Sequence, residues 1–132
     1  MLRKYATSSV ALLFVFAFAL TISARADHWV YLGNAHVDSA DDHKNIKVGS
    51  DDGQFHKIQL RVHGGAVDFQ RVVIHYGNGD KEELPVQDRV RDGGKTKSLE
   101  LPGERRTIES VELWYSKEHL DTRPEVRLYA TR

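Results

Sequence analysis

One loop of this sequence concentrates side chains that could bind a metal ion. The stretch "HVDSADDH" brings together five such residues: His36, Asp38, Asp41, Asp42 and His43. Imidazole with carboxylate suits Zn²⁺ or Cu²⁺, and several carboxylates with backbone carbonyls suit Ca²⁺. The spacing is not that of an EF-hand calcium loop. We expect a solvated polar loop here and keep a Zn, Cu or Ca site as the alternative.

A second candidate site consists of Trp114 and His75. In "IESVELWY", if Leu113 and Tyr115 face the interior, Trp114 faces outward, because side chains alternate along a strand. His75 holds the equivalent position in "FQRVVIHY", which aligns with it without a gap. Outward aromatic side chains on a sheet stack on sugar rings or anchor a partner protein. We therefore predict Trp114 and His75 as ligand-binding residues for an unknown protein or carbohydrate partner, unless a loop covers Trp114 or both faces of its strand are buried.

Catalytic patterns are scarce in the chain. There is no cysteine, so no thiol nucleophile exists. The segment "GSDDG" at 49–53 departs from the G-x-S-x-G elbow that exposes a catalytic serine. Carboxylate pairs can be found among 19 acidic residues, but the sequence does not give the separation that glycoside hydrolysis requires. We expect a non-enzymatic protein without a cofactor, and keep a hydrolase with unrecognised carboxylates as a further alternative.

Two adjacent arginines follow a Pro-Gly turn in "LPGERR". Arg106 shares the parity of the apolar Ile108, which predicts that it leans inward. An inward guanidinium needs a carboxylate or backbone carbonyls as partner. We expect a structural ion pair at Arg106 and not an anion site.

Short runs of alternating apolar and polar residues carry these side chains. Such runs, bounded by turn residues, predict β-strands. About eight of them recur along the chain, which predicts a single antiparallel β-sandwich of jelly-roll type. The expected strands are 29–32, 45–48, 56–62, 67–76, 81–86, 96–101, 107–115 and 125–130.

Local signals refine this strand pattern. The "HYGNGD" segment lies between two strands, and Asn78-Gly79 favours a tight hairpin turn in which both residues have positive φ. In the two long strands the apolar period of two is interrupted by one step of three. A β-bulge absorbs such a step, so we predict bulges near Gln70-Arg71 and near Glu109-Ser110.

The N-terminus resembles a secretory signal peptide. Arg3 and Lys4 precede the apolar run "ALLFVFAFALTI", and "SARA" offers an A-x-A cleavage site. We expect residues 1–26 to be removed and 27–132 to form the domain. The run is shorter than the roughly 20 residues of a spanning helix, so we expect no membrane span after cleavage.

Removal of this leader changes the charge. Of the 19 Lys and Arg residues, Arg3, Lys4 and Arg25 are lost, while all 19 acids remain, so the net charge becomes about −3. An acidic domain does not suit nucleic acid, which binds a basic face. We expect a periplasmic or secreted protein with no nucleic-acid partner.

Several of these segments together resemble a family of small exported bacterial β-sandwich domains of unknown function. The resemblance covers "WVYLGNAHVD", "FHKIQLRVHGGAVDFQRVVIHYGNG", "GGKTKSLELPGERRTIESVELWY" and the terminal "VRLYA". It implies a compact β-sandwich and an export signal, and it transfers no catalytic residue. The sequence therefore indicates an exported binding or structural module.

Overall fold

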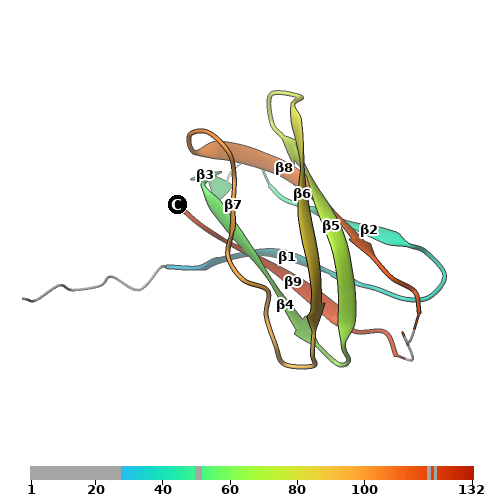
Figure 1. Ribbon diagram of the computed structural model, residues 1–132. Helices are drawn as coiled ribbons and strands as arrows, with labels where there is room; N and C mark the ends of the chain where they lie inside the picture. The colour runs from blue at the N-terminus through green and yellow to red at the C-terminus, as the bar shows by residue number, and fades with distance from the viewer. Residues whose placement is uncertain (1–27, 50–51, 119, 121) are drawn as a thin grey trace, which may run out of the picture.

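The computed structural model describes residues 28–49, 52–118, 120 and 122–132. The predicted leader, 1–26, and the expected mature start at Asp27 lie outside these residues. Within these residues, nine strands form two antiparallel sheets packed face to face (Figure 1). In chain order the strands are β1 (Val30–His36), β2 (His43–Lys47), β3 (Gln54–Phe55), β4 (Lys57–His63), β5 (Val67–Tyr76), β6 (Lys81–Val90), β7 (Leu99–Glu100), β8 (Arg106–Tyr115) and β9 (Glu125–Thr131). No helix that could cross a bilayer occurs in the described part of the chain.

The strand order is that of a jelly roll. One sheet runs β1-β9-β4-β7, and the other runs β2-β8-β5-β6 with β3 also paired to β8. β1 pairs with β9, both β2 and β3 pair with β8, β4 pairs with β7, and β5 pairs with β6. The pairs therefore run from the two ends of the chain inward to the hairpin of β5 and β6. This is a two-sheet antiparallel ribbon folded on itself. The predicted all-β, jelly-roll-like sandwich is confirmed.

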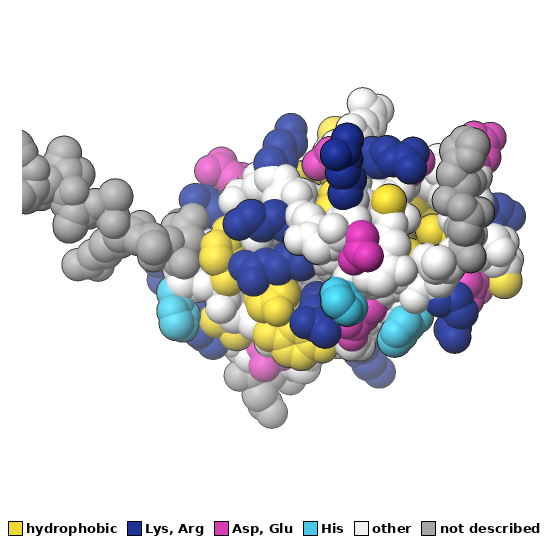
Figure 2. Space-filling model, turned by 90° about the horizontal axis from the view of Figure 1, so that it is seen from below, with side chains coloured by type: hydrophobic (Ala, Val, Ile, Leu, Met, Phe, Trp, Pro, Cys, Tyr) yellow, Lys and Arg dark blue, Asp and Glu magenta, His cyan; other side chains and the backbone are white. Residues whose placement is uncertain are grey.

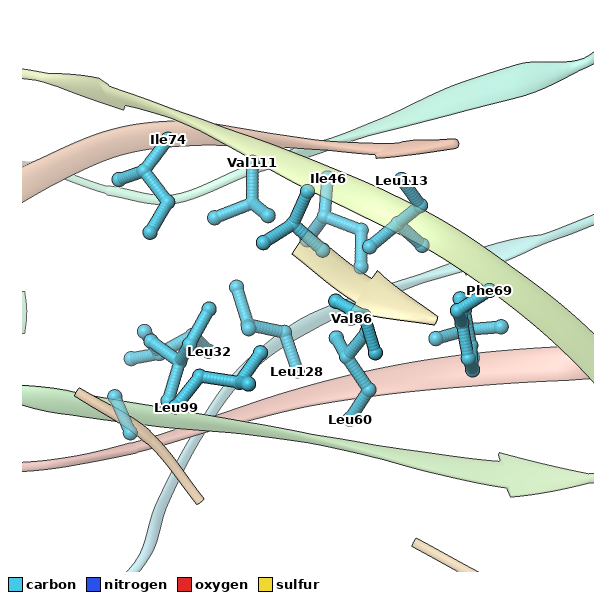
Figure 3. Close-up of a cluster of buried hydrophobic side chains, with 14 of the residues drawn as sticks. Leu32, Ile46, Leu60, Phe69, Ile74, Val86, Leu99, Val111, Leu113 and Leu128 are labelled. Atoms are coloured by element: carbon cyan, nitrogen blue, oxygen red, sulfur yellow. The ribbon is translucent and has the colours of Figure 1, made fainter. Parts of the chain in front are cut away.

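Apolar side chains from the two sheets point toward one another and fill the space between them (Figure 3). Leu32, Leu60 and Leu128 come from the four-stranded sheet, and Val111 and Leu113 from the five-stranded sheet. All of these are buried, so the period of two in the sequence corresponds to burial of every second residue.

Both predicted bulges are confirmed. Gln70 is the extra residue where β5 passes from the Phe69–Tyr115 pair to the Arg71–Trp114 pair. On β8, Glu109 is extra between the partners of His75 and Tyr76. Each bulge restores the inward phase of its strand after the step of three.

The hairpin of β5 and β6 is also confirmed, but one of its backbone conformations was predicted incorrectly. Gly79 has φ of 93°, whereas Asn78 has no positive φ. The N–H of Gly79 donates to the Tyr76 carbonyl at 3.0 Å, and the N–H of Tyr76 donates to the Asp80 carbonyl at 2.9 Å. This is a type I turn followed by a left-handed glycine, which needs positive φ at one residue only.

Strand lengths differ from prediction at the edges. β7 is shorter than the expected 96–101, because Thr96 meets β4 irregularly: its hydroxyl, not its backbone carbonyl, accepts from Leu60 N–H at 3.1 Å. β6 extends to Val90 and forms the free edge of its sheet. It carries Pro85 and, at Gln87, a φ of 45°, where β6 bulges against β5.

Candidate functional site

Trp114 and His75 lie on the outer face of the five-stranded sheet. Their neighbours Leu113 and Ile74 are buried in the core, so alternation turns Trp114 and His75 to the other side of the sheet. Both side chains are half-buried. We call this surface the tryptophan face; its members are His43, Arg71, Val73, His75, Lys81, Glu83, Glu112 and Trp114.

Neighbouring strands place a side chain on each face of the Trp114 ring. Residues His43, Trp114 and Arg71 are directly paired across β2, β8 and β5. The His43 ring stacks on the indole with centroids 4.4 Å apart and planes 16° apart. The Arg71 guanidinium carbon lies 4.3 Å from the centre of the indole ring. Both flat surfaces of Trp114 are therefore occupied by the protein itself, and a sugar ring has neither to stack on.

Charged pairs surround this stack. His75 Nε2 lies 3.2 Å from Glu112 Oε2, within hydrogen-bond distance. Arg71 Nε lies 3.4 Å from Glu83 Oε1, close enough for charge attraction but without hydrogen-bond geometry. A hollow of about 350 Å³ lies among Arg71, Lys81, Glu83 and Glu112 beside Trp114. The exposed surface of the tryptophan face therefore consists mainly of paired positive and negative side chains, and not of an open aromatic ring.

The structure does not gather the predicted metal ligands into one site. Lys44 occupies the space between the carboxylates, with Nζ 2.9 Å from Asp41 and 3.9 Å from Asp38. Asp42 is bound by His43 Nδ1 at 2.9 Å. Within the described residues, no group of three or more His, Asp or Glu side chains is arranged to hold a metal.

The electrostatics of this loop follow from those internal pairs. A hydrogen bond from Lys44 lowers the pKa of Asp41, and one from His43 lowers the pKa of Asp42. His36 lies before the loop, at the end of β1, opposite Glu125 of β9. Asp41 and Asp42 are thus paired with the first two residues of β2.

A second aromatic surface, which the sequence reasoning missed, covers the outside of the four-stranded sheet. Tyr31 of β1 and Tyr129 of β9 are paired across the strands, and their rings meet edge to face with centroids 5.6 Å apart. Tyr31 is 50% exposed, and among the described residues it is the one large hydrophobic side chain that is exposed. We call this surface the tyrosine face; its members are Tyr31, Asn34, Arg61, Glu125, Arg127 and Tyr129.

Polar side chains around the two tyrosines are held in place. The Arg61 guanidinium lies 3.9 Å from the centre of the Tyr129 ring, and its Nε donates to Gln59 Oε1 at 3.1 Å. Arg127 Nε donates to Glu125 at 2.8 Å. These fixed donors and acceptors surround two aromatic rings on a rigid sheet.

Glu125 is the acid of this surface. Asn34 donates to the carboxylate oxygen that Arg127 leaves free. Burial alone would raise the pKa of Glu125, but the hydrogen bonds from Arg127 and Asn34 outweigh it and hold that pKa below its ordinary value. A hollow of about 230 Å³ opens among Tyr31, Glu125, Arg127 and Tyr129.

Figure 2 shows how side-chain types gather on the surface seen from below. Basic side chains and histidines border a hydrophobic patch on this face. This side of the molecule combines apolar and cationic groups.

One half of the tyrosine face could have been found from the sequence. In "EVRLY" the buried Val126 and Leu128 require Tyr129 to point outward. Tyr31 was harder, because β1 has an irregular register between Tyr31 and Gly33, and the short "WVYLG" run gives no reliable phase.

Comparison with known proteins gives a family and a fold. Residues 9–130 match the family described as "Domain of unknown function (DUF2541)". No curated protein matches the chain. Among solved structures, it is similar to one described as "Structural and functional characterization of Pseudomonas aeruginosa AlgX", with a TM-score of 0.52 and 13% identity. The match covers 83% of this chain and 28% of that one, and at this identity it shows the fold alone.

Proposed function

The chain belongs to the DUF2541 family, whose description names no activity, and we propose from its geometry that the protein is an exported, non-enzymatic module that binds a saccharide through the tyrosine face. The observation that carries this proposal is the half-exposed ring of Tyr31 beside Tyr129. An apolar patch rimmed by polar residues is typical of an interaction site, and the paired rings of Tyr31 and Tyr129 are bordered by Glu125 and Arg127.

The geometry of the tyrosine face favours a sugar. Tyrosine offers a flat apolar ring for the C–H face of a pyranose and loses little conformational entropy on binding, since it has only two side-chain torsions. Hydroxyl groups of a sugar need both donors and acceptors, and Asn34, Arg127 and Glu125 supply them around the hollow. Because these residues lie on paired strands, their side chains lose little further conformational entropy when a ligand binds.

Export is part of the proposal and rests on the sequence. The basic residues, apolar run and A-x-A pattern of positions 1–26 are those of a cleaved signal peptide. A domain facing the periplasm or the exterior meets glycans of the cell envelope and surroundings. This location suits a saccharide-binding surface.

The test is a titration of ¹⁵N-labelled protein with soluble oligosaccharides, followed by NMR. The probes are cellotetraose, chitotetraose and oligogalacturonate, so that neutral, acetamido and acidic sugars are all represented. We expect saturable shifts at Tyr31, Tyr129 and their neighbours for at least one probe. Tyr31→Ala should weaken that binding about tenfold or more, the loss expected when one stacking ring of roughly 1–2 kcal/mol is removed.

His75→Ala is the matched control, since it removes a ring from the opposite face of the sandwich. It should leave saccharide affinity unchanged. Shifts confined to Trp114 and His75 would instead place the binding site on the tryptophan face. Absence of any saturable shift, combined with recovery of a protein partner that Tyr31→Ala fails to bind, would replace the saccharide by a protein.

A further inference from the structure

A hollow at one end of the sandwich has a different chemical character from both outer faces. It measures about 520 Å³ and lies between the turn of β5 and β6, the short β3 and the start of β8 (Figure 1, upper end). Its lining consists of Gln54, Tyr76, Gly77, Asn78, Arg105, Arg106 and Thr107. We call it the hairpin pocket.

Arg106 is held in one orientation inside this pocket. Its guanidinium carbon lies 3.6 Å from the centre of the Tyr76 ring, and its Nη2 donates to Asp80 at 2.8 Å. Asp80 is itself fixed by Asn78, whose Nδ2 donates to the same oxygen at 3.1 Å. The expected structural pair of Arg106 is thus present. It uses one end of a guanidinium that has five N–H donors, so donors remain for a ligand.

Arg105 is a second cation on the same rim. It is exposed, and no ion pair to it is found among the described residues. Gln54 and Asn78 add amide groups from β3 and from the hairpin turn. An arginine held by stacking beside a free one is a suitable receptor for an oxyanion, because guanidinium matches carboxylate or phosphate oxygens in pairs.

The absence of acids from its lining distinguishes the hairpin pocket. The hollow on the tryptophan face includes Glu83 and Glu112, and that on the tyrosine face includes Glu125. Among the described residues, those that line the hairpin pocket include two arginines and no Asp or Glu. Asp80 offsets part of the charge of Arg106 from outside the lining, and Arg105 keeps its full charge.

A buried donor lies beside these cations. Tyr76 is buried in the core, and within the described residues its hydroxyl has no hydrogen-bond partner. Burial raises the pKa of this phenol, and the Arg106 guanidinium beside it acts in the opposite direction. Unsatisfied buried donors are rare in folded proteins and often mark a place for a water or ligand oxygen.

From this arrangement we propose that the hairpin pocket binds an oxyanion group, a carboxylate or phosphate carried by a small ligand, through Arg105 and Arg106. The site shares no residue with the tyrosine face and is independent of saccharide binding there. Gly77 lines the pocket beside Thr107, which is the residue that a side chain at position 77 would contact.

The experiment is an NMR titration of the labelled protein with inorganic phosphate and with acetate, each against chloride at the same ionic strength. We expect saturable shifts at Gly77, Asn78 and Thr107 with at least one oxyanion and not with chloride. Comparison of the phosphate titration with the acetate titration distinguishes a phosphate site from a carboxylate site. Arg105→Gln should weaken binding about tenfold, the loss of one charge-assisted hydrogen bond.

Arg89→Gln is the matched control, because it removes one positive charge from an exposed strand position on β6 that is paired with Asp68. It should leave the titration unchanged. A second variant, Gly77→Ala, adds a methyl group between two lining residues without backbone strain, since Gly77 has no positive φ and the new methyl meets Thr107 at 3.4 Å. It should also weaken binding. Shifts that fail to saturate, or that survive in Arg105→Gln, would overturn the proposal.

Discussion

The two outer faces of this sandwich both carry aromatic rings, but they use them differently. On the tryptophan face, His43 and Arg71 cover the two sides of the Trp114 ring. On the tyrosine face, Arg61 covers Tyr129 while Tyr31 remains half exposed. One ring is thus built into the sheet and the other is available to a partner. An aromatic residue that points outward is a candidate for binding only when its flat surface is free.

The reason for the difference lies in strand position. Trp114 belongs to β8, which has β2 on one side and β5 on the other, so residues of two strands reach its ring. Tyr31 belongs to β1, the outermost strand of its sheet, and has a neighbouring strand on one side only. An edge position leaves one flank of a ring open, whereas a central position supplies neighbours for both.

The largest expected effect uses Leu113 as the reference for Trp114. Leu113→Ala should lower the free energy of unfolding by about 2–5 kcal/mol, because it leaves a cavity in the core. Trp114→Ala should lower it by about 1–3 kcal/mol, the combined size of a ring stack and a cation–π contact. Chemical denaturation of both variants measures this. A loss at Trp114 below about 0.5 kcal/mol, the scale of an ordinary surface change, would show that the stack is not structural and would reopen the tryptophan face as a binding site.

A smaller effect is expected at Tyr31. Tyr31→Ala should change the free energy of unfolding by no more than about 0.5 kcal/mol, as is usual for surface substitutions, while abolishing most saccharide binding. Chemical denaturation measures the free energy of unfolding of this variant, and the sugar titration of the same sample measures its saccharide affinity. If stability falls as far as in Trp114→Ala, the two faces do not differ in the way described, and Tyr31 has a folding role.

The smallest effect concerns the pH dependence of Glu125. Its pKa is lower in the folded protein than in the unfolded chain, so its ionised form stabilises the fold above the unfolded pKa. That contribution is lost as the pH falls through the folded pKa. Glu125→Gln should therefore cost under about 1 kcal/mol at pH 7, and the difference from wild type should begin to shrink near the unfolded pKa of about 4.3 and vanish below the folded pKa. A difference that persists unchanged into acid would assign the effect to packing and not to charge.

Strand phase was predictable because it is local. The buried alternation, both bulges and the outward direction of Trp114 and His75 follow from residue types within ten positions of one another. The match to a family of unknown function likewise agrees with the resemblance of the quoted segments. The signal peptide and the bound partner stay predictions.

What covers an outward residue was not predictable in the same way. His43 and Arg71 reach Trp114 from strands far away in the sequence, and only the pairing register brings them to its ring. The pairing of Lys44 with Asp41 is different, because it joins residues only three positions apart where the acidic loop passes into β2. The predicted positive φ of Asn78 was wrong, because an Asn-Gly pair fits two kinds of hairpin turn. One has positive φ at both residues, and the other is a type I turn followed by a left-handed glycine. The hydrogen bonds of this hairpin correspond to the second kind.

The free edge of β6 has a consequence for solubility. A sheet edge with a row of unpaired N–H and C=O groups can recruit a strand from another copy and start aggregation. At Pro85 this edge has no N–H to offer, and at Gln87 the backbone turns out of line. Charged Lys81, Glu82 and Glu83 precede these two residues. These features make the β6 edge a poor template for a strand of another copy, so the two sandwiches would not join through it into a continuous sheet.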